Sequence, residues 1–368
     1  MQLKGSMHDG NPLNYRSLLI LITYLSVCLA ITTYICVLLV GRAQFAKKSK
    51  WPIEWGKVVF FGLLAIASLS ATWYYMFDFF AYSYHDWACG KNLELEEATL
   101  DTLEMWLRET KLFKEAWGSV VNTPHRYWWS GQIFFWTTAW SLFIGVMGRR
   151  YQIPNTWAYM LLGQIVAISF AQNLFFLSIV LSRPYFDLQS TMQTPNVYLE
   201  LLPLLVSLVS SAIVPYVADS KHFLYTLLIP HLLLFIPTTI QAHGKLKGPL
   251  ISQSVTKRYI RIFSWIFGAA SLFQVWTMFY ALASPSPVPL RRARDTCAFE
   301  PAQDTQAAED VGQRLLGTVF EHPAVSSVSW DVVFCTVGFL SWAAAHRFYA
   351  KDMLGGIVAG SKEKKREE

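Results

Sequence analysis

HRYWWSGQIFFWTTAWSLF, residues 125–143, contains four tryptophans and begins with a histidine, an arginine and a tyrosine. Its length and apolar content predict a transmembrane helix, although helices that face lipid are usually rich in Leu, Ile and Val. Indole rings gather at the membrane–water boundary, and this accounts for Trp128 and Trp129. Trp136 and Trp140 lie deeper along the same helix. We therefore expect these two rings to line a cavity inside the protein.

The whole chain has the composition of a membrane protein. It has 368 residues, of which 53% are hydrophobic and 15% are charged, whereas a soluble domain carries about 25% charged residues. Crossing a hydrocarbon core of about 30 Å takes about 20 apolar residues. Backbone groups in lipid must satisfy their own hydrogen bonds, so such segments are helical. The apolar blocks are 17–40, 57–83, 128–147, 156–182, 197–217, 222–242, 259–284 and 328–350.

Basic residues flank these blocks and predict the orientation. The net charge is +6, and basic clusters occur at 42–50, 149–150, 245–258 and in the tail, 351–368. Such flanks mark the cytoplasmic side and explain the charge without nucleic-acid binding. If every cluster is cytoplasmic, one of the three blocks between the second and third clusters is re-entrant or pairs without crossing. We thus expect an all-α polytopic membrane protein with seven crossings, a lumenal N-terminus and a cytosolic tail. Eight crossings remain the alternative.

A single helical domain, 1–368, is expected, with two longer segments outside the membrane. Residues 93–123 form an amphipathic, lumenal, interfacial helix in this prediction, and 285–327, which begins SPSPVP, form a flexible loop. Cys89 and Cys297 fall in loops that the seven-crossing arrangement places in the lumen, so a disulfide between them stays open. The apolar face of the amphipathic helix comprises Leu103, Trp106, Leu107, Thr110, Phe113 and Trp117.

Ionisable residues at membrane depth are costly and usually serve a function. The candidates for a proton-donating acid are Asp78, Glu115, Glu200 and Asp331. Asp78 is the first choice, because aromatic residues enclose it in the sequence. With Arg126, Arg183 and Asp187, the four acids are expected near one level at the lumenal face. The alternative is that Glu200 and Asp331 cap helix starts and that Asp78 is only interfacial.

Aromatic and amide side chains form the predicted substrate-binding set. Its members are Trp73, Arg126, Trp129, Trp136, Trp140, Gln164, Gln172, Asn173, Arg183 and Asp187. Gln172 and Asn173 can equally serve to bond neighbouring helices, and His231 is expected to be structural. Aromatic faces attract cations by about 2 kcal/mol or more when desolvated, and a carboxyl group in an apolar pocket can act as a general acid. Together these groups suit a cavity in which a carbocation forms.

Two stretches resemble a known family. Residues 106–181, from WLRETKLFKEAWG to AQNLFFLSIVL, and SSVSWDVVFC at 326–335 resemble fungal integral-membrane terpene cyclases of meroterpenoid pathways, of the ascofuranone and macrophorin type. The resemblance covers about a third of the chain. It implies proton-initiated cyclisation of a farnesyl or epoxyfarnesyl chain on a lipophilic prenylated substrate, in the endoplasmic reticulum membrane, with no metal and no other cofactor. The sequence fits this, because it lacks the DDxxD and NxxxDxxxD motifs of metal-dependent terpene synthases.

Three other functions are alternatives. A transporter would distribute its charges through the membrane depth, whereas the acids are expected at one side. A seven-helix receptor would carry a larger cytosolic surface than these short loops offer. A non-catalytic membrane scaffold of a biosynthetic pathway stays open, as do the substrate's ring pattern and the oligomeric state.

Overall fold

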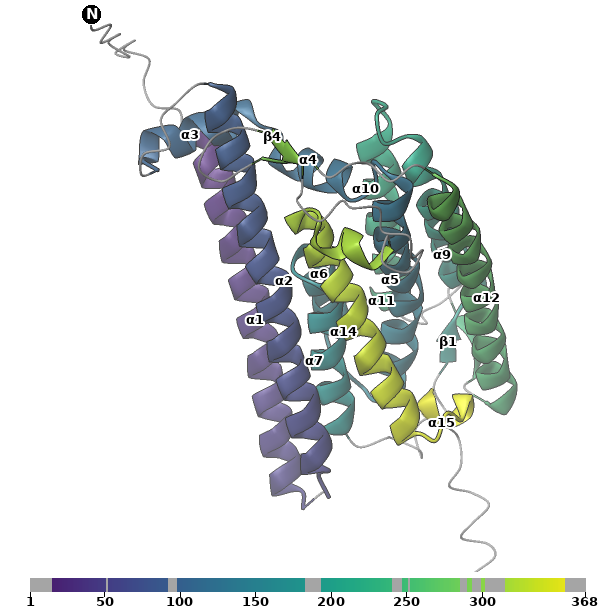
Figure 1. The fold of residues 1–368 in the computed structure, drawn as a ribbon. Coiled ribbons are helices and arrows are strands. Elements are labelled where there is room, and N and C mark those ends of the chain that lie inside the picture. The colour runs from purple at the N-terminus through teal and green to yellow at the C-terminus, as the bar shows by residue number, and fades with distance from the viewer. Residues whose placement is uncertain are drawn as a thin grey trace, which may run out of the picture.

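The protein is a bundle of helices in the computed structural model, which describes residues 15–50, 52–91, 98–182, 193–239, 247–250, 252–284, 290–292, 299–301 and 315–354 (Figure 1). Its long helices are α1 (Arg16–Lys48), α2 (Trp55–Gly90), α5 (Pro124–Arg150), α9 (Val197–Ile213), α12 (Gln253–Ala283) and α14 (Pro323–Ala345). The shorter ones are α3 (Leu100–Glu109), α4 (Leu112–Ser119), α6 (Thr156–Ile165), α7 (Ile168–Val180), α10 (Phe223–Leu233), α11 (Phe235–Thr239) and α15 (Ala350–Met353). Single 3₁₀ turns lie at η1 (Val214–Tyr216) and η3 (Thr318–Phe320).

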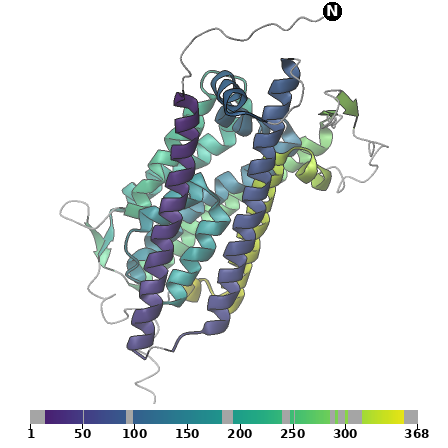
Figure 2. The same cartoon turned by 90° about the vertical axis from the view of Figure 1, so that its left-hand side faces the viewer.

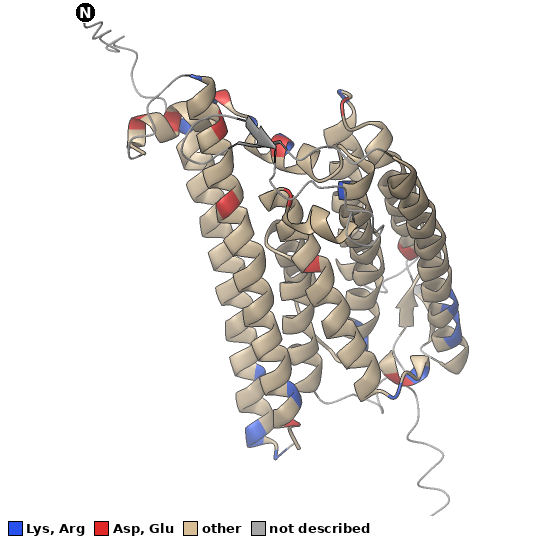
Figure 3. Ribbon diagram, viewed as in Figure 1, with Lys and Arg blue, Asp and Glu red and all other residues tan. Residues whose placement is uncertain are grey.

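Strands play a small part. β1 (Gln193–Pro195) pairs antiparallel with β2 (Lys247–Leu250), and β3 (Leu290–Arg292) pairs antiparallel with β4 (Phe299–Pro301). The expected all-helical fold is confirmed. Of the described helices, five are long and apolar enough to cross a membrane: α1, α2, α9 extended through η1, α12 and α14. Lys and Arg gather at one end of these helices and leave their middle parts almost free of charge (Figure 3). The chain is therefore an integral membrane protein.

The tryptophan-rich stretch forms the central helix, α5. Thr123 caps its start by accepting a hydrogen bond from the Arg126 backbone N–H, and Pro124 occupies its first turn, both of which favour helix initiation. Of its 27 residues, 21 are buried, and α6, α7, α9, α11, α12 and α14 all pack against it. A helix that is covered on every side has no lipid-facing stripe, which explains why this one is not simply rich in Leu, Ile and Val.

The long helices run between two ends of the bundle. We name them the α4 end, where α3 and α4 lie, and the α15 end, where α15 lies (Figure 1). Helix α5 runs from the first to the second, because its last residue, Arg150, donates to the Leu354 carbonyl next to α15. Helix α9 runs back: it begins beside α5's last turn and ends where the Tyr127 hydroxyl donates to the Ser211 carbonyl. Helix α14 starts at the α4 end, where Glu321 pairs with Arg126.

The apolar block 156–182, expected as one span, is a helical hairpin. Helix α6 enters from the α15 end and stops at Ile165, and α7 starts at Ile168 and returns to the same end. The two helices pack on each other through Tyr159, whose hydroxyl lies 2.5 Å from Ser178 Oγ. Helix α1 packs on α6 and α2 packs on α7, so the hairpin lies between and behind these two helices (Figure 2).

Other expectations need smaller corrections. The amphipathic segment is two helices, α3 and α4, interrupted at 110–111, and its Glu104 is buried although the sequence pattern places it on the polar side. Helix α14 begins at Pro323, so the loop expected to reach residue 327 ends earlier. Cys89 is disulfide-bonded. Its expected partner, Cys297, lies outside the described residues.

A buried ion pair joins three helices at the α15 end. Glu200 of α9 is fully buried and accepts from Arg149 Nη2 at 2.6 Å and from the Tyr259 hydroxyl of α12 at 2.9 Å. Arg149 also donates to the Pro237 carbonyl of α11 at 3.4 Å. The expectation that Glu200 lies at the same level as the other acids is therefore wrong, because α9 starts beside the last turn of α5.

We expect Glu200→Gln to lower the thermal stability of the protein in detergent strongly. The change leaves the largely buried Arg149 guanidinium without its counter-charge, and removing one partner of a buried pair costs about 3–5 kcal/mol. Thermal unfolding of the purified variants measures the effect. Glu54→Gln is the matched control, since it removes the exposed partner of Lys57 and surface pairs contribute little. Equal melting temperatures for the two variants would contradict a stabilising role for the Glu200 pair.

Candidate functional site

Two cavities lie among the helices of the bundle. One lies at the tip of the α6–α7 hairpin, and the other lies beside α7. The polar cavity, about 370 Å³, lies around the tip of the hairpin and contains Asp331 and His231. The aromatic cavity, about 280 Å³, lies nearer the α15 end between α5, α7, α12 and α14. These volumes lie around the lower end of the range for small-molecule sites, about 300–1,000 Å³. Both are candidate sites for a lipophilic molecule.

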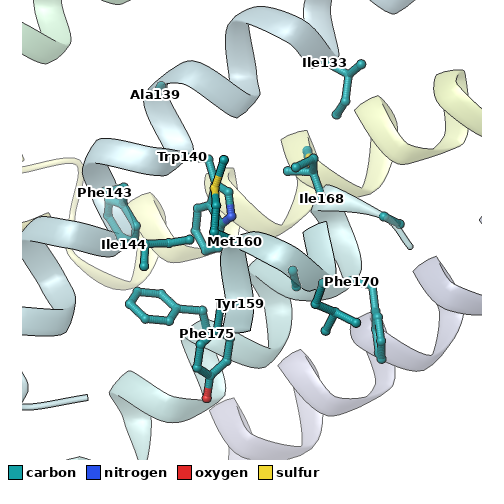
Figure 4. Close-up of a cluster of buried hydrophobic side chains, with 14 of the residues drawn as sticks. Ile133, Ala139, Trp140, Phe143, Ile144, Tyr159, Met160, Ile168, Phe170 and Phe175 are labelled. Atoms are coloured by element: carbon teal, nitrogen blue, oxygen red, sulfur yellow. The ribbon is translucent and has the colours of Figure 1, made fainter. Parts of the chain in front are cut away.

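Trp136 and Trp140 line the aromatic cavity, as expected. Trp140 stacks on Phe143 with ring centroids 5.8 Å apart, and both rings also meet Phe175. Figure 4 shows these rings in the packed core beside α6 and α7. The remaining lining residues are Ala139, Gln172, Phe176, Ile260, Phe263, Ser264, Phe267, Phe339, Ala350, Met353 and Leu354. None of the described residues in this wall is charged, so the expected acid beside these deep indoles is not found among them.

The Gln172 amide in the wall of the aromatic cavity is already engaged, whereas the buried Trp140 Nε1 has no hydrogen-bond partner within the described part of the chain. Trp136 Nε1 donates to Gln172 Oε1 at 2.7 Å, and Gln172 Nε2 donates to the Cys335 carbonyl of α14 at 2.9 Å. These two hydrogen bonds hold α5, α7 and α14 together at one level of the bundle. Gly338 allows the close approach, because a Cβ there would lie 2.6 Å from Asn173 Oδ1 and 2.9 Å from Gln172 Nε2. The expectation that Gln172 binds neighbouring helices is confirmed.

The polar cavity takes its wall from the hairpin tip and from six other helices, which are α1, α2, α4, α5, α10 and α14. Its apolar lining combines aromatic rings with a larger number of aliphatic side chains, and a few polar residues interrupt it. The aromatic members are Tyr24, Phe79, Phe80, Phe113, Trp117 and Phe134. The polar members are Thr72, Thr137, Gln164, His231, Ser327 and Asp331. A wall of hydrophobic and aromatic side chains with a few polar groups is the usual composition of a ligand site.

Asp331 occupies the break between α6 and α7. Its Oδ1 accepts from the Ser169 backbone N–H at 2.7 Å and its Oδ2 accepts from the Ile168 backbone N–H at 3.1 Å. The first N–H groups of a helix have no partner within it, and the positive end of the helix dipole favours an acid. Asp331 was considered as a cap of its own helix. In the structure it caps α7 from the neighbouring α14 and presents its carboxyl group at the cavity.

His231 of α10 faces the same cavity. Its Nδ1 lies 2.5 Å from the Leu227 carbonyl, one turn earlier in α10, and its ring meets Trp117 edge-on at 6.0 Å. Gln164 Nε2 donates to the His231 carbonyl at 2.9 Å and so ties α10 to the end of α6. His231 was expected to be structural. Its position in the wall makes it a second titratable group of the candidate site.

Tyr24 lies in this wall on the side of α1. Its hydroxyl donates to the Ile165 carbonyl at 2.6 Å, at the hairpin break, and lies 3.9 Å from Met76 Sδ of α2. Its ring meets Phe113 of α4 edge-on. Tyr24 therefore joins α1, α2, α4 and the hairpin at one point. There is little sequence signal for it, because the apolar first block contains a second tyrosine, Tyr34.

Asp331 is alone among the four candidate acids in reaching a cavity. Asp78 is half-buried on α2 and belongs to neither wall. Glu115 is exposed and accepts from the Lys111 backbone N–H at 2.8 Å, at the start of its own helix. Glu200 is bound in the ion pair at the α15 end. Neither Asp78 nor Glu115 is a lining residue of these two cavities, and the four acids do not lie at one level, because Glu200 lies at the α15 end.

The predicted binding residues do not lie together in one cavity. Gln164 lines the polar cavity, and Trp136, Trp140 and Gln172 line the aromatic cavity. Trp73, Arg126, Trp129 and Asn173 belong to neither wall, while Arg183 and Asp187 lie outside the described residues. Arg126 Nη2 lies 2.9 Å from Glu321 and Trp129 Nε1 donates to the Leu315 carbonyl at 2.9 Å. These two residues therefore connect the start of α5 to the segment that precedes α14.

Comparisons with protein-family models, with curated proteins and with solved structures found no match to this chain. The family resemblance therefore rests on the sequence stretches alone. The function has to be argued from the two cavities and from the acid and the imidazole that the fold brings to one of them.

Proposed function

We propose that this protein is a membrane-embedded, metal-independent terpene cyclase. In this proposal it protonates and closes a farnesyl or epoxyfarnesyl chain of a lipophilic meroterpenoid substrate. One observation carries the proposal: Asp331 is the one carboxyl group among the described residues that reaches this cavity, and six aromatic rings stand in the same wall. A proton donor, a wall that stabilises positive charge and an enclosure that limits water are what such a reaction requires. The family resemblance of residues 106–181 and 326–335 supports the same chemistry.

The hydrogen bonds of Asp331 indicate where the proton would sit. A protonated carboxyl group still accepts at its carbonyl oxygen, so Oδ1 can keep the shorter bond to Ser169. Oδ2, which has the longer bond to Ile168, would carry the proton. Transfer of that proton to a terminal alkene carbon or epoxide oxygen produces a carbocation in the chain. Phe79, Phe80 and Phe134, with Trp117, would stabilise the cation as it moves, each by about 2 kcal/mol when desolvated.

The helix arrangement supports seven crossings. Helices α1, α2, α5, α9, α10 with α11, α12 and α14 each connect the two ends, and α6 with α7 returns to the end it started from. The basic clusters at 42–50 and 149–150 and the start of α12 then share the α15 end. In this proposal the α15 end is cytosolic, the N-terminus is lumenal and the membrane is that of the endoplasmic reticulum.

A carrier is the second candidate, and the broken hairpin favours it. Transporters often bind their cargo where a helix is interrupted within the membrane, with a helix N-terminus directed at the ligand. The start of α7 has this placement. Its N–H groups are, however, occupied by Asp331, so an anionic cargo would have to displace a carboxylate that the protein itself supplies.

Asp331→Asn is expected to reduce turnover of a phenol bearing an epoxyfarnesyl chain by about 10²–10⁴-fold, the usual effect of losing a proton donor. Microsomes containing each variant are incubated with this substrate, and cyclised product is measured by mass spectrometry. Asp78→Asn is the matched control and should keep the wild-type rate, because Asp78 is not in the cavity wall.

Since Asp331 also caps α7, thermal stability and substrate binding of the variant are measured alongside. A folded Asp331→Asn protein that binds the substrate and converts it at the wild-type rate would exclude Asp331 as the acid. Uptake of intact substrate into vesicles without conversion would favour the carrier.

Epitope tags should map the ends of the seven-crossing arrangement to opposite sides. Tags at the N-terminus and after Asp219 are expected in the lumen, and tags after Asp187 and at the C-terminus are expected in the cytosol. Protease protection of sealed microsomes distinguishes the sides. If the α6–α7 block crossed the membrane, there would be eight crossings and both termini would lie on one side.

A further inference from the structure

The polar cavity has an imidazole as well as an acid, and they come from different helices. Asp331 belongs to α14 and His231 to α10, and both line the wall of the same cavity. Proton-initiated cyclisation needs two proton transfers: one creates the cation and one ends the reaction. Asp331 can account for the first transfer only.

The protonation of the His231 ring follows from its hydrogen bond. The Leu227 carbonyl oxygen can only accept, so Nδ1, 2.5 Å away, carries the hydrogen. In the neutral ring, Nε2 then bears the lone pair. Trp117 meets the ring edge-on and helps to fix its plane. The ring is therefore held in the tautomer that a base needs.

We infer that His231 is the base that ends the cyclisation, an inference that rests on the proposed function. Nε2 removes a proton from the carbon next to the final cationic centre, and the electrons of that C–H bond form the new C=C bond. The imidazolium then returns its proton to the Asp331 carboxylate after the product leaves. The proton that Asp331 donated is recovered, so the net reaction is an isomerisation that consumes no co-reactant.

A purely structural His231 would behave differently from a base. Its Nδ1 bond and the bond from Gln164 to its carbonyl both serve packing, and a glutamine can keep a donor for Leu227. His231→Gln therefore preserves the structural contact and removes the group that takes up the proton. His346→Gln is a matched control, because His346 Nδ1 makes the same bond to a carbonyl one turn earlier, that of Trp342 at 2.8 Å, and lies in neither cavity wall.

The first experiment analyses products of the epoxyfarnesyl phenol by mass spectrometry. In His231→Gln we expect formation of the wild-type alkene to fall by about 10²-fold or more, while substrate is still consumed. Alcohols from water addition, or isomeric alkenes, should replace the product. Asp331→Asn should instead stop consumption, and His346→Gln should match the wild type. The wild-type alkene at the wild-type rate from His231→Gln would overturn the inference.

A second experiment is independent of turnover. A farnesyl bromoketone is incubated with the membrane protein, and modified peptides are identified by mass spectrometry. Attack by Nε2 on the carbon that bears bromine forms a C–N bond and releases bromide, so we expect alkylation of His231 that excess epoxyfarnesyl phenol prevents. An unlabelled His231 would overturn the inference. Labelling of His231 without any turnover by the wild type would count against the proposed cyclase while leaving a basic imidazole in the cavity.

Discussion

Helix α5 is enclosed on all sides. The packing of the other helices depends on the apolar contacts and hydrogen bonds that its side chains make with them. A buried helix needs apolar contact all round, and its polar groups need partners from its neighbours. The Ser141 hydroxyl donates to the Leu234 carbonyl, Thr138 Oγ1 lies 2.6 Å from Ser207 Oγ, and the Tyr127 hydroxyl reaches the Ser211 carbonyl. Small and hydroxyl-bearing residues let helices approach closely in a membrane. The large rings of α5 fill the remaining space, and those that no neighbour fully covers become cavity walls.

The second constraint is the cost of breaking a helix at membrane depth. Unsatisfied backbone groups cost several kcal/mol each in hydrocarbon, and irregular backbone is tolerated only where protein covers it. At the hairpin tip the Asp331 carboxylate accepts two N–H groups and the Tyr24 hydroxyl donates to the Ile165 carbonyl. Side chains from α14 and α1 thus complete the hydrogen bonding that α6 and α7 lack. The same requirement brings a carboxyl group into a cavity that is otherwise largely apolar.

Much of the fold follows from the sequence, and less of the site does. Apolar blocks and basic flanks predict the helices. They do not show which block fails to cross, because each block is long enough to span the lipid. The break at 166–167 has no sequence signal: QIVAIS contains neither Gly nor Pro, and its cap comes from a residue more than 160 positions away. The preference for Asp78 failed for a related reason. Sequence showed the aromatic neighbours of Asp78, but the side of α2 that faces the cavity depends on α4, α5 and the hairpin. From the sequence His231 is expected to be structural, because nothing in the sequence shows that its ring reaches a cavity.

The double role of Asp331 connects stability to chemistry. An ionised carboxylate accepts well at both oxygens, whereas a protonated one accepts well at one only. Donating a proton therefore strengthens the cap of α7, and taking it back weakens the bond to Ile168. The hairpin tip is thus most firmly held when Asp331 is ionised, which in the proposed reaction is while the cation is present. An acid placed on an exposed turn would lack this coupling, since water would replace any bond that protonation weakened. A buried helix end is therefore a better position for a recyclable proton donor than the half-buried site of Asp78 or the exposed site of Glu115.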